Sequence, residues 1–243
     1  MGLAASAAVA LGATAATLVV DTSSEFRPTF SNAQKQVPGN QSPAHVSADH
    51  VPRPTPNAIA SSNPGLAFSV SGLNFNDQRT ADGGNKFSLE PPDQAFCVGN
   101  GLALEAVNDV FAFYNTSGVK QGGTMALNPF FTLDHQFDRT TGAVGEDLFD
   151  PKCYYDPVLG RFFFVIDHLG VNPATGALNG NAFVDIAVSK TSTPTTSRSD
   201  WFFYQLNVKN NGTGGTPSHP NCPCFGDQSL IGADTYGFFM STN

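Results

Sequence analysis

Three segments of this chain repeat one pattern: an aspartate, a turn that contains glycine, and an apolar stretch that ends at Asn or Asp. The aspartate precedes the turn glycine by 8, 10 and 10 residues, and the glycine precedes the closing residue by 7, 7 and 6 residues. Because this spacing is nearly constant, we interpret the segments as three copies of one β-hairpin. The copies span residues 93–108, 150–167 and 227–243.

The distance between the copies predicts the architecture. The turn glycines Gly101, Gly160 and Gly237 lie 59 and 77 residues apart, which is roughly the interval of one β-propeller blade with long loops. We therefore predict an all-β fold made of antiparallel meander blades, with two blades and part of a third. A propeller typically closes with about four to eight blades, so we expect an incomplete ring and an N-terminal part of a longer protein. The expected strands cover residues 102–107 and 110–114 in the first blade, and 152–155, 161–167, 182–189 and 201–208 in the second.

Composition argues against one class of partner. Charged residues make up 13% of the chain, the net charge is −8, and Lys and Arg form no run. A nucleic-acid-binding surface needs a basic patch, so nucleic acid is not an expected partner. The 21 Phe, 24 Gly and 17 Pro residues are typical of many short strands joined by turns.

The N-terminal residues 1–20 are uncharged and small or apolar, and they predict a signal peptide or an N-terminal anchor. The small-x-small triplet at residues 13–15 offers a cleavage site, which would release a secreted, extracellular protein. Two alternatives stay open. The 19 residues from 2 to 20 are long enough to span a bilayer, and the first six residues match the N-myristoylation pattern.

Residues 21–92 are rich in Ser, Asn, Pro, Ala and Thr, and this composition predicts a linker without regular structure. Within it, residues 65–73 alternate apolar and polar positions, so one strand is expected there. The partial propeller domain is expected to cover residues 93–243.

The four cysteines fit an oxidising compartment. Cys97 and Cys153 occupy corresponding places in the first two copies, so a disulfide between them is the first pairing that we expect, although four cysteines allow three pairings. Cys222 and Cys224 are the other disulfide candidates. With His219 they could instead bind Zn²⁺, but a disulfide fits an exported chain better.

The segments at residues 91–109, 150–165, 185–195 and 222–243 resemble a group of exported, propeller-like proteins without an assigned activity. That group is distantly similar to sialidase-type propellers, which also repeat an Asp and Gly hairpin. The stretch YDPVLGRF at residues 155–162 lacks the Ser and Thr positions of a sialidase Asp-box. The resemblance implies the fold and export, and it supplies no catalytic residue.

The repeated aspartates Asp93, Asp150 and Asp227 are candidate ligand-binding residues, because equivalent positions in a propeller form a ring on one face. Carboxylates in a ring suit Ca²⁺ or a polyhydroxyl ligand. Repetition favours a structural role, since a carboxylate that accepts backbone hydrogen bonds is needed in every blade and a catalytic residue only once. The same structural role is expected for Asp156 and Asp234. We predict no cofactor and no metal site, with Ca²⁺ at the repeated aspartates as the alternative.

Residues without a counterpart in the other copies are better candidates for function. Glu105 and Asp167 could act as the acid and base or nucleophile of a glycosidase if both face the channel. Arg161 and Trp201 are candidate ligand-binding residues, the first as a clamp and the second as a stacking platform for a sugar. The simpler role of Arg161 is that of an ion partner of Glu105 or a surface residue, and the simpler role of Trp201 is that of a core side chain. His168 belongs to the same group.

Two functions are compatible with these patterns. The first is a non-catalytic exported module that binds an extracellular glycan or protein and is monomeric at full length. The second is a fragment of a sialidase-like glycoside hydrolase or lyase. We favour the first, because the common hydrolase and nucleotide-binding motifs are missing from the sequence.

Overall fold

The computed structural model describes residues 5–11, 14–20 and 69–242. The chain divides into two compact units, Met1–Thr22 with Val70–Asn243, and Ser23–Ser69, and nearly all of the second lies outside the described residues. At the N-terminus, β1 (Ala5–Leu11) and β2 (Thr14–Val20) pair as an antiparallel hairpin. The targeting role expected for residues 1–20 stays a prediction. Among the helices of the described residues, none has the length and apolar character needed to cross a membrane.

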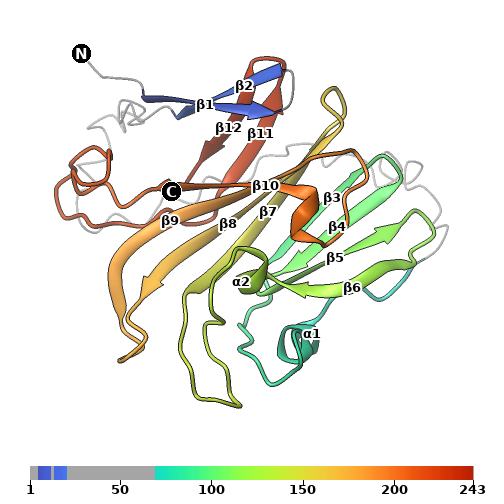
Figure 1. The fold of residues 1–243 in the computed structure, drawn as a ribbon, viewed down its shortest axis with the longest axis horizontal. Coiled ribbons are helices and arrows are strands. Elements are labelled where there is room, and N and C mark those ends of the chain that lie inside the picture. Colours follow the sequence, from blue (N-terminus) through green and yellow to red (C-terminus); the bar gives the residue numbers. More distant parts are fainter. Residues whose placement is uncertain (1–4, 12–13, 21–68, 243) are drawn as a thin grey trace, which may run out of the picture. The chain divides into compact units, whose positions relative to one another are not determined.

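The fold is β-rich and antiparallel, as the sequence predicts, and Figure 1 shows its sheets. The first sheet has the order β3-β4-β5-β6, the second has the order β10-β9-β8-β7, and the third is the hairpin β11-β12. Each sheet is therefore a meander in which consecutive strands are neighbours. The strands are β3 (Gln94–Gly99), β4 (Leu102–Val107), β5 (Val110–Asn115), β6 (Lys120–Ala126), β7 (Asp147–Asp156), β8 (Arg161–Val171), β9 (Leu178–Ser189), β10 (Trp201–Asn207), β11 (Leu230–Asp234) and β12 (Gly237–Ser241).

Short turns with positive φ angles set the hairpins of the first two copies. Between β3 and β4, Asn100 and Gly101 have φ angles of +48° and +79°, the combination that a type I′ hairpin turn requires. Between β7 and β8, the turn ends at Gly160 with φ of +63°. The strands expected at residues 102–107, 110–114, 152–155, 161–167, 182–189 and 201–208 are present, although β7, β8 and β9 extend beyond the predicted ends.

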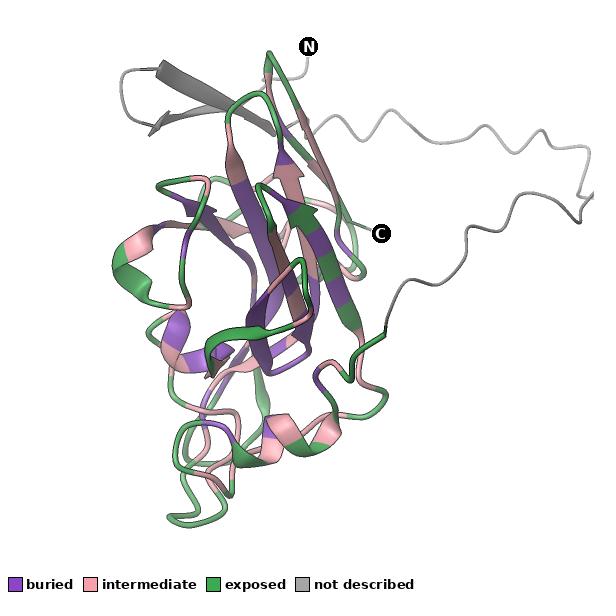
Figure 2. Cartoon of the chain, turned by 90° about the vertical axis from the view of Figure 1, so that its right-hand side faces the viewer, coloured by how far each residue is buried: buried purple, intermediate pink, exposed green. Residues whose placement is uncertain are grey.

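The three sheets pack face to face. One core lies between the first and second sheets and contains Phe111 and Leu104 opposite Phe162 and Phe164. A second core lies between the second and third sheets and contains Phe163 opposite Phe238, whose rings stack with centroids 4.9 Å apart. Successive β8 residues thus enter opposite cores, as strand geometry requires. The buried strands in the middle of the molecule are visible in Figure 2.

The edge strands β3, β7 and β11 begin the three sheets, and β7 lies beside both of the others. The disulfide Cys97–Cys153, the pairing expected from the repeat, joins β3 to β7 with the Cα atoms 5.7 Å apart. On the other side, the Tyr154 hydroxyl donates a hydrogen bond to the Ala233 carbonyl at 3.4 Å, which connects β7 to β11. Equivalent positions of the three copies therefore lie on neighbouring strands.

The linker predicted for residues 21–92 extends too far. Residues 21–68 lie outside the described residues, but helix α1 (Phe75–Thr80) follows them, and Leu73 and Ala81 at its two ends are buried against the first sheet. In the strand expected at residues 65–73, the described residues 69–73 form no strand. A second short helix, α2 (Leu127–Phe130), follows β6 and places Phe130 in the first core.

Candidate functional site

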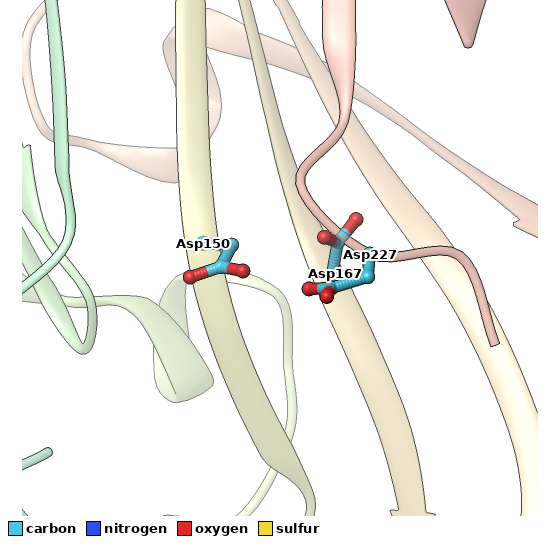
Figure 3. Close-up of side chains that lie close together, drawn as sticks. All are labelled: Asp150, Asp167 and Asp227. Atoms are coloured by element: carbon cyan, nitrogen blue, oxygen red, sulfur yellow. The ribbon is translucent and has the colours of Figure 1, made fainter. Parts of the chain in front are cut away.

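The repeated aspartates come together where the first strands of the sheets are neighbours. Asp150 lies on β7, and Asp93 and Asp227 lie in the segments that lead into β3 and β11. Asp167, on β8, joins them from within the second sheet. One carboxylate oxygen from each of Asp150, Asp167 and Asp227 lies within 4.8 Å of the others, and Figure 3 shows these three side chains. The repeat thus builds one acidic cluster, which we define as Asp93, Asp150, Asp167 and Asp227.

Backbone distortion places Asp150 in this cluster. The pairing of β7 with β8 is irregular between Phe149 and Lys152, and Asp150 has a φ angle of +53°. Such a bulge redirects a side chain relative to the regular strand. The Asp150 carboxylate accepts a hydrogen bond from the Gln228 side chain at 2.8 Å, so it contacts the segment that leads into the third sheet.

The closing residues of the first two copies connect each copy to the next. Asn108 closes the first copy, and its side-chain oxygen accepts a hydrogen bond from the backbone N–H of Asp150 at 3.2 Å. Asp167 closes the second copy, and its Oδ1 accepts a hydrogen bond from the Ser229 hydroxyl at 2.7 Å. The polar residue that ends each of the first two copies therefore has a structural role between neighbouring sheets.

Burial dominates the electrostatics of the cluster. Burial, together with the nearby carboxyl groups of Asp227 and Asp93, raises the pKa of Asp150 to about 7. Burial also raises the pKa of Asp167 to about 6, although hydrogen bonds from Ser229 act in the opposite direction. Both raised pKa values mean that the protein's own hydrogen bonds and charges do not offset the cost of burying these carboxyl groups in their charged form.

A second buried polar group lies in the second sheet around His168. Its Nδ1 is 2.8 Å from Asp185 Oδ2, and the other oxygen of Asp185 accepts a hydrogen bond from Gln205 at 2.8 Å. Its Nε2 is 3.7 Å from the Glu146 carboxylate. Because His168 is 4% exposed and links β8, β9 and β10, its contacts are those of a buried structural network.

The proposed acid and base pair, Glu105 and Asp167, is not brought together. Glu105 faces away from the second sheet and accepts a hydrogen bond from the backbone N–H of Leu73 at 3.0 Å. The Asp167 side chain lies on the face of the second sheet that points away from the first sheet, where it contacts Ser229. The glycosidase arrangement expected for these two residues is therefore absent from the structure, because strand alternation points them to different layers.

The two non-aspartate ligand candidates also lie outside the cluster. Arg161 begins β8, six positions from Asp167, and its guanidinium donates to the neighbouring Gly160 carbonyl at 3.0 Å. Trp201 is 2% exposed in the first core, and its indole N–H donates to the Thr195 carbonyl at 2.9 Å. Trp201 cannot serve as a sugar platform in this arrangement, because its faces are covered by Phe113 and neighbouring rings.

The remaining candidates have structural contacts. Asp156 Oδ1 accepts backbone hydrogen bonds from Val158 and Leu159, and Asp234 Oδ1 accepts them from Tyr236 and Gly237. These contacts confirm the structural role expected for both aspartates at their turns. Cys222 and Cys224 form a disulfide, so they are not available as Zn²⁺ ligands beside His219.

Sequence reasoning anticipated the repeated aspartates and missed the contribution of Asp167 to their cluster. A signal was present, because the second copy closes with Asp where the first closes with Asn. No protein-family model matches the chain, and comparisons with curated proteins and with solved structures give no match either.

Proposed function

We propose that this chain forms consecutive blades of an exported β-propeller that binds an extracellular glycan or protein and does not catalyse a reaction. Three features support the blade assignment: the meander order of each sheet, the face-to-face packing, and the neighbouring first strands. Two disulfides favour an oxidising compartment and therefore export.

Exposed apolar residues on the outer faces of the stack also support a propeller. Phe96 and Val98 are 65% and 55% exposed on the first sheet, and Leu230 and Phe239 are 67% and 43% exposed on the third. In a closed ring, each blade is covered on both faces by its neighbours. Such apolar side chains would be buried by blades on either side.

The observation that carries the binding function is the apolar character of two equivalent turns. Val158 in the β7–β8 turn is 76% exposed, and Tyr236 in the β11–β12 turn is 83% exposed. The turns lie at the same end of neighbouring strands, since Tyr154 contacts Ala233 just before them. Exposed aromatic and aliphatic side chains on adjacent loops are typical of a contact surface for a partner.

Catalysis has less support. The only pair of carboxylates that sequence reasoning offered as acid and base is separated, and the clustered aspartates Asp150 and Asp167 are 5% and 1% exposed. A glycosidase needs both carboxyl groups to flank an accessible sugar. The sialidase-like alternative would therefore need direct evidence that the chain releases a sugar.

The test is binding of the full chain to a printed panel of glycans and to intact cells. We expect Tyr236→Ala and Val158→Ser to reduce binding at least tenfold, and Val119→Ser, on the exposed β5–β6 turn of the first sheet, to leave it unchanged. Equal binding by the turn variants and wild type would overturn the assignment of these turns. Release of sugar from a glycoside or sialoside by the wild-type chain would support the hydrolase alternative instead.

A further inference from the structure

The acidic cluster concentrates negative charge in a buried place. Oxygens of Asp150, Asp167 and Asp227 lie within 4.8 Å of one another. Asp150 and Asp167 are buried, so water does little to screen their repulsion. The ammonium group of Lys152 donates to the Gln228 side chain at 3.4 Å, and among the described residues no ion pair neutralises a carboxylate of the cluster.

An independent observation concerns Asp167 alone. Its side chain is 1% exposed, and Oδ1 accepts a hydrogen bond from Ser229, but Oδ2 has no hydrogen-bond partner in the described part of the chain. A buried carboxylate oxygen without a partner costs on the order of 1–3 kcal/mol or more. Figure 3 shows this side chain beside that of Asp227, and one oxygen of the Asp167 carboxylate lies within 4.8 Å of oxygens of Asp150 and Asp227, so the carboxylate that carries the unpartnered oxygen belongs to the cluster.

The donor atoms identify the class of ligand. The cluster offers carboxylate oxygens with no His or Cys. Hard cations such as Ca²⁺ and Mg²⁺ bind all-oxygen sites of this kind, whereas Zn²⁺ favours sites with nitrogen and sulfur ligands. Two oxygens that share one Ca²⁺ lie at most about 5 Å apart, because each Ca–O bond is about 2.3–2.6 Å long. The carboxylate separations within 4.8 Å meet this limit.

The surroundings favour Ca²⁺ over Mg²⁺. The ligands come from two strands and a loop, and the Ser229 hydroxyl oxygen lies beside Asp167 as a further donor. Ca²⁺ accepts roughly six to eight oxygen ligands in flexible geometry, whereas Mg²⁺ demands a near-ideal octahedron and keeps several waters. An irregular site built from three carboxylates and a hydroxyl therefore suits the larger ion.

We propose that Asp150, Asp167 and Asp227 bind one Ca²⁺ ion, and that this ion links the second sheet to the segment that leads into the third. The proposal takes up the alternative that the sequence left open, Ca²⁺ at the repeated aspartates, with Asp167 in place of Asp93. Asp150 and Asp167 belong to β7 and β8, while Asp227 precedes β11, so the ion stabilises the packing between sheets. The inference goes beyond glycan or protein binding and does not depend on it.

Calcium titration of the full chain tests the site. The protein is stripped with EDTA, dialysed, and titrated with CaCl₂ and separately with MgCl₂ by calorimetry, and thermal unfolding is followed at each concentration. We expect one Ca²⁺ per chain, a Tm that rises with Ca²⁺ concentration, and Mg²⁺ affinity at least tenfold weaker. No heat and no Tm change with Ca²⁺ would overturn the proposal, and equal affinity for the two ions would overturn the assignment to Ca²⁺.

Matched variants locate the ion. We expect Asp167→Asn to weaken Ca²⁺ binding at least tenfold, and Asp134→Asn, at an exposed aspartate outside the cluster, to bind as wild type does. Wild-type affinity in the Asp167→Asn variant would place the ion elsewhere and overturn the site. If that variant does not fold, Asp227→Asn takes its place, since Asp227 is only half-buried, and the same comparison with Asp134→Asn decides.

Discussion

The side chain of Asn108 joins the end of the first copy to the start of the second, because its oxygen accepts a hydrogen bond from the Asp150 N–H at 3.2 Å. Its amide group donates to the Pro91 carbonyl at 2.8 Å, and the residue is fully buried. Asp167 makes the equivalent connection to Ser229 in the next copy. The need for a short side chain with a hydrogen-bond acceptor explains why the first copy closes with Asn and the second with Asp.

Replacing Asn108 with Ala should destabilise the protein strongly. The change removes the Asn108 partner of the buried Asp150 N–H, and an unsatisfied buried group costs about 1–3 kcal/mol. It also removes the Asn108 hydrogen bond to the Pro91 carbonyl, which keeps the one from the Asp93 N–H at 3.0 Å. We expect the free energy of unfolding to fall by roughly 3 kcal/mol, as measured by urea unfolding. Asn76→Ala on the exposed face of α1 is the control and should change stability by less than about 0.5 kcal/mol. Similar losses in both variants would contradict the role of Asn108.

The two disulfides should differ in their contribution to stability. Cys97–Cys153 closes a loop with a sequence separation of 56, while Cys222–Cys224 has a separation of 2. In the chain-entropy treatment, the first is worth roughly 4 kcal/mol and the second less than about 2 kcal/mol. The double variants C97A/C153A and C222A/C224A, compared by urea unfolding, should follow this order. A larger loss for the C222A/C224A variant would show that loop length does not set the difference.

Much of the fold could be predicted because its signals are local. Turn residues such as Asn100 and Gly101 fix hairpins through positive φ angles, and alternating apolar residues identify strands. Helix α1 was missed because it lies in a segment whose composition is typical of a linker. Its signal was the capping box formed by Asn74 and Asp77, a pattern that a composition-based prediction does not weigh.

The site could be predicted only in part, because it depends on which strands are neighbours. Repetition of Asp93, Asp150 and Asp227 indicated a shared environment, and the structure places them in one cluster. The separation of Glu105 from Asp167 was not predictable, since it follows from how two sheets stack. Residue type alone does not say which layer a strand side chain enters.

Trp201 provides a test of the first core. It is the only Trp in the chain, and it packs with Phe111, Phe113 and Phe130 at ring centroid distances of 6.4, 6.2 and 5.7 Å. Trp201→Ala should cost about 3–5 kcal/mol, as is usual for truncating a large buried aromatic side chain. Circular dichroism during urea unfolding measures this loss, because the variant has no Trp fluorescence.

A matched aromatic truncation serves as the control for Trp201. Tyr236 is 83% exposed at the β11–β12 turn, so Tyr236→Ala should change the free energy of unfolding by less than about 0.5 kcal/mol. A small loss in Trp201→Ala would contradict its place in the core and would reopen its role as a surface for sugar stacking.

Stability should fall as pH rises from about 4 to 8, because of buried carboxyl groups outside the acidic cluster. Burial and the charge of Asp147 raise the pKa of Asp109 to about 7, and burial raises the pKa of Asp147 to about 6, partly offset by His168. The folded state therefore binds more protons than the unfolded state in this range. Because stability rises with pH only where the unfolded state binds more protons, the free energy of unfolding here decreases with pH.

Asp109→Asn isolates this effect. Asn stays neutral, so the variant avoids the cost of ionising Asp109, which is on the order of 4 kcal/mol from a shift of the pKa from 3.8 to about 7. We expect the free energy of unfolding of Asp109→Asn, relative to that of wild type, to increase by a few kcal/mol between pH 4 and pH 8. Urea unfolding in EDTA at both pH values measures this difference, and contributions from Asp150 and Asp167 cancel because both proteins retain them. Asp134→Asn should show no such change, and a difference independent of pH in Asp109→Asn would mean that Asp109 is ionised in the folded protein throughout this range.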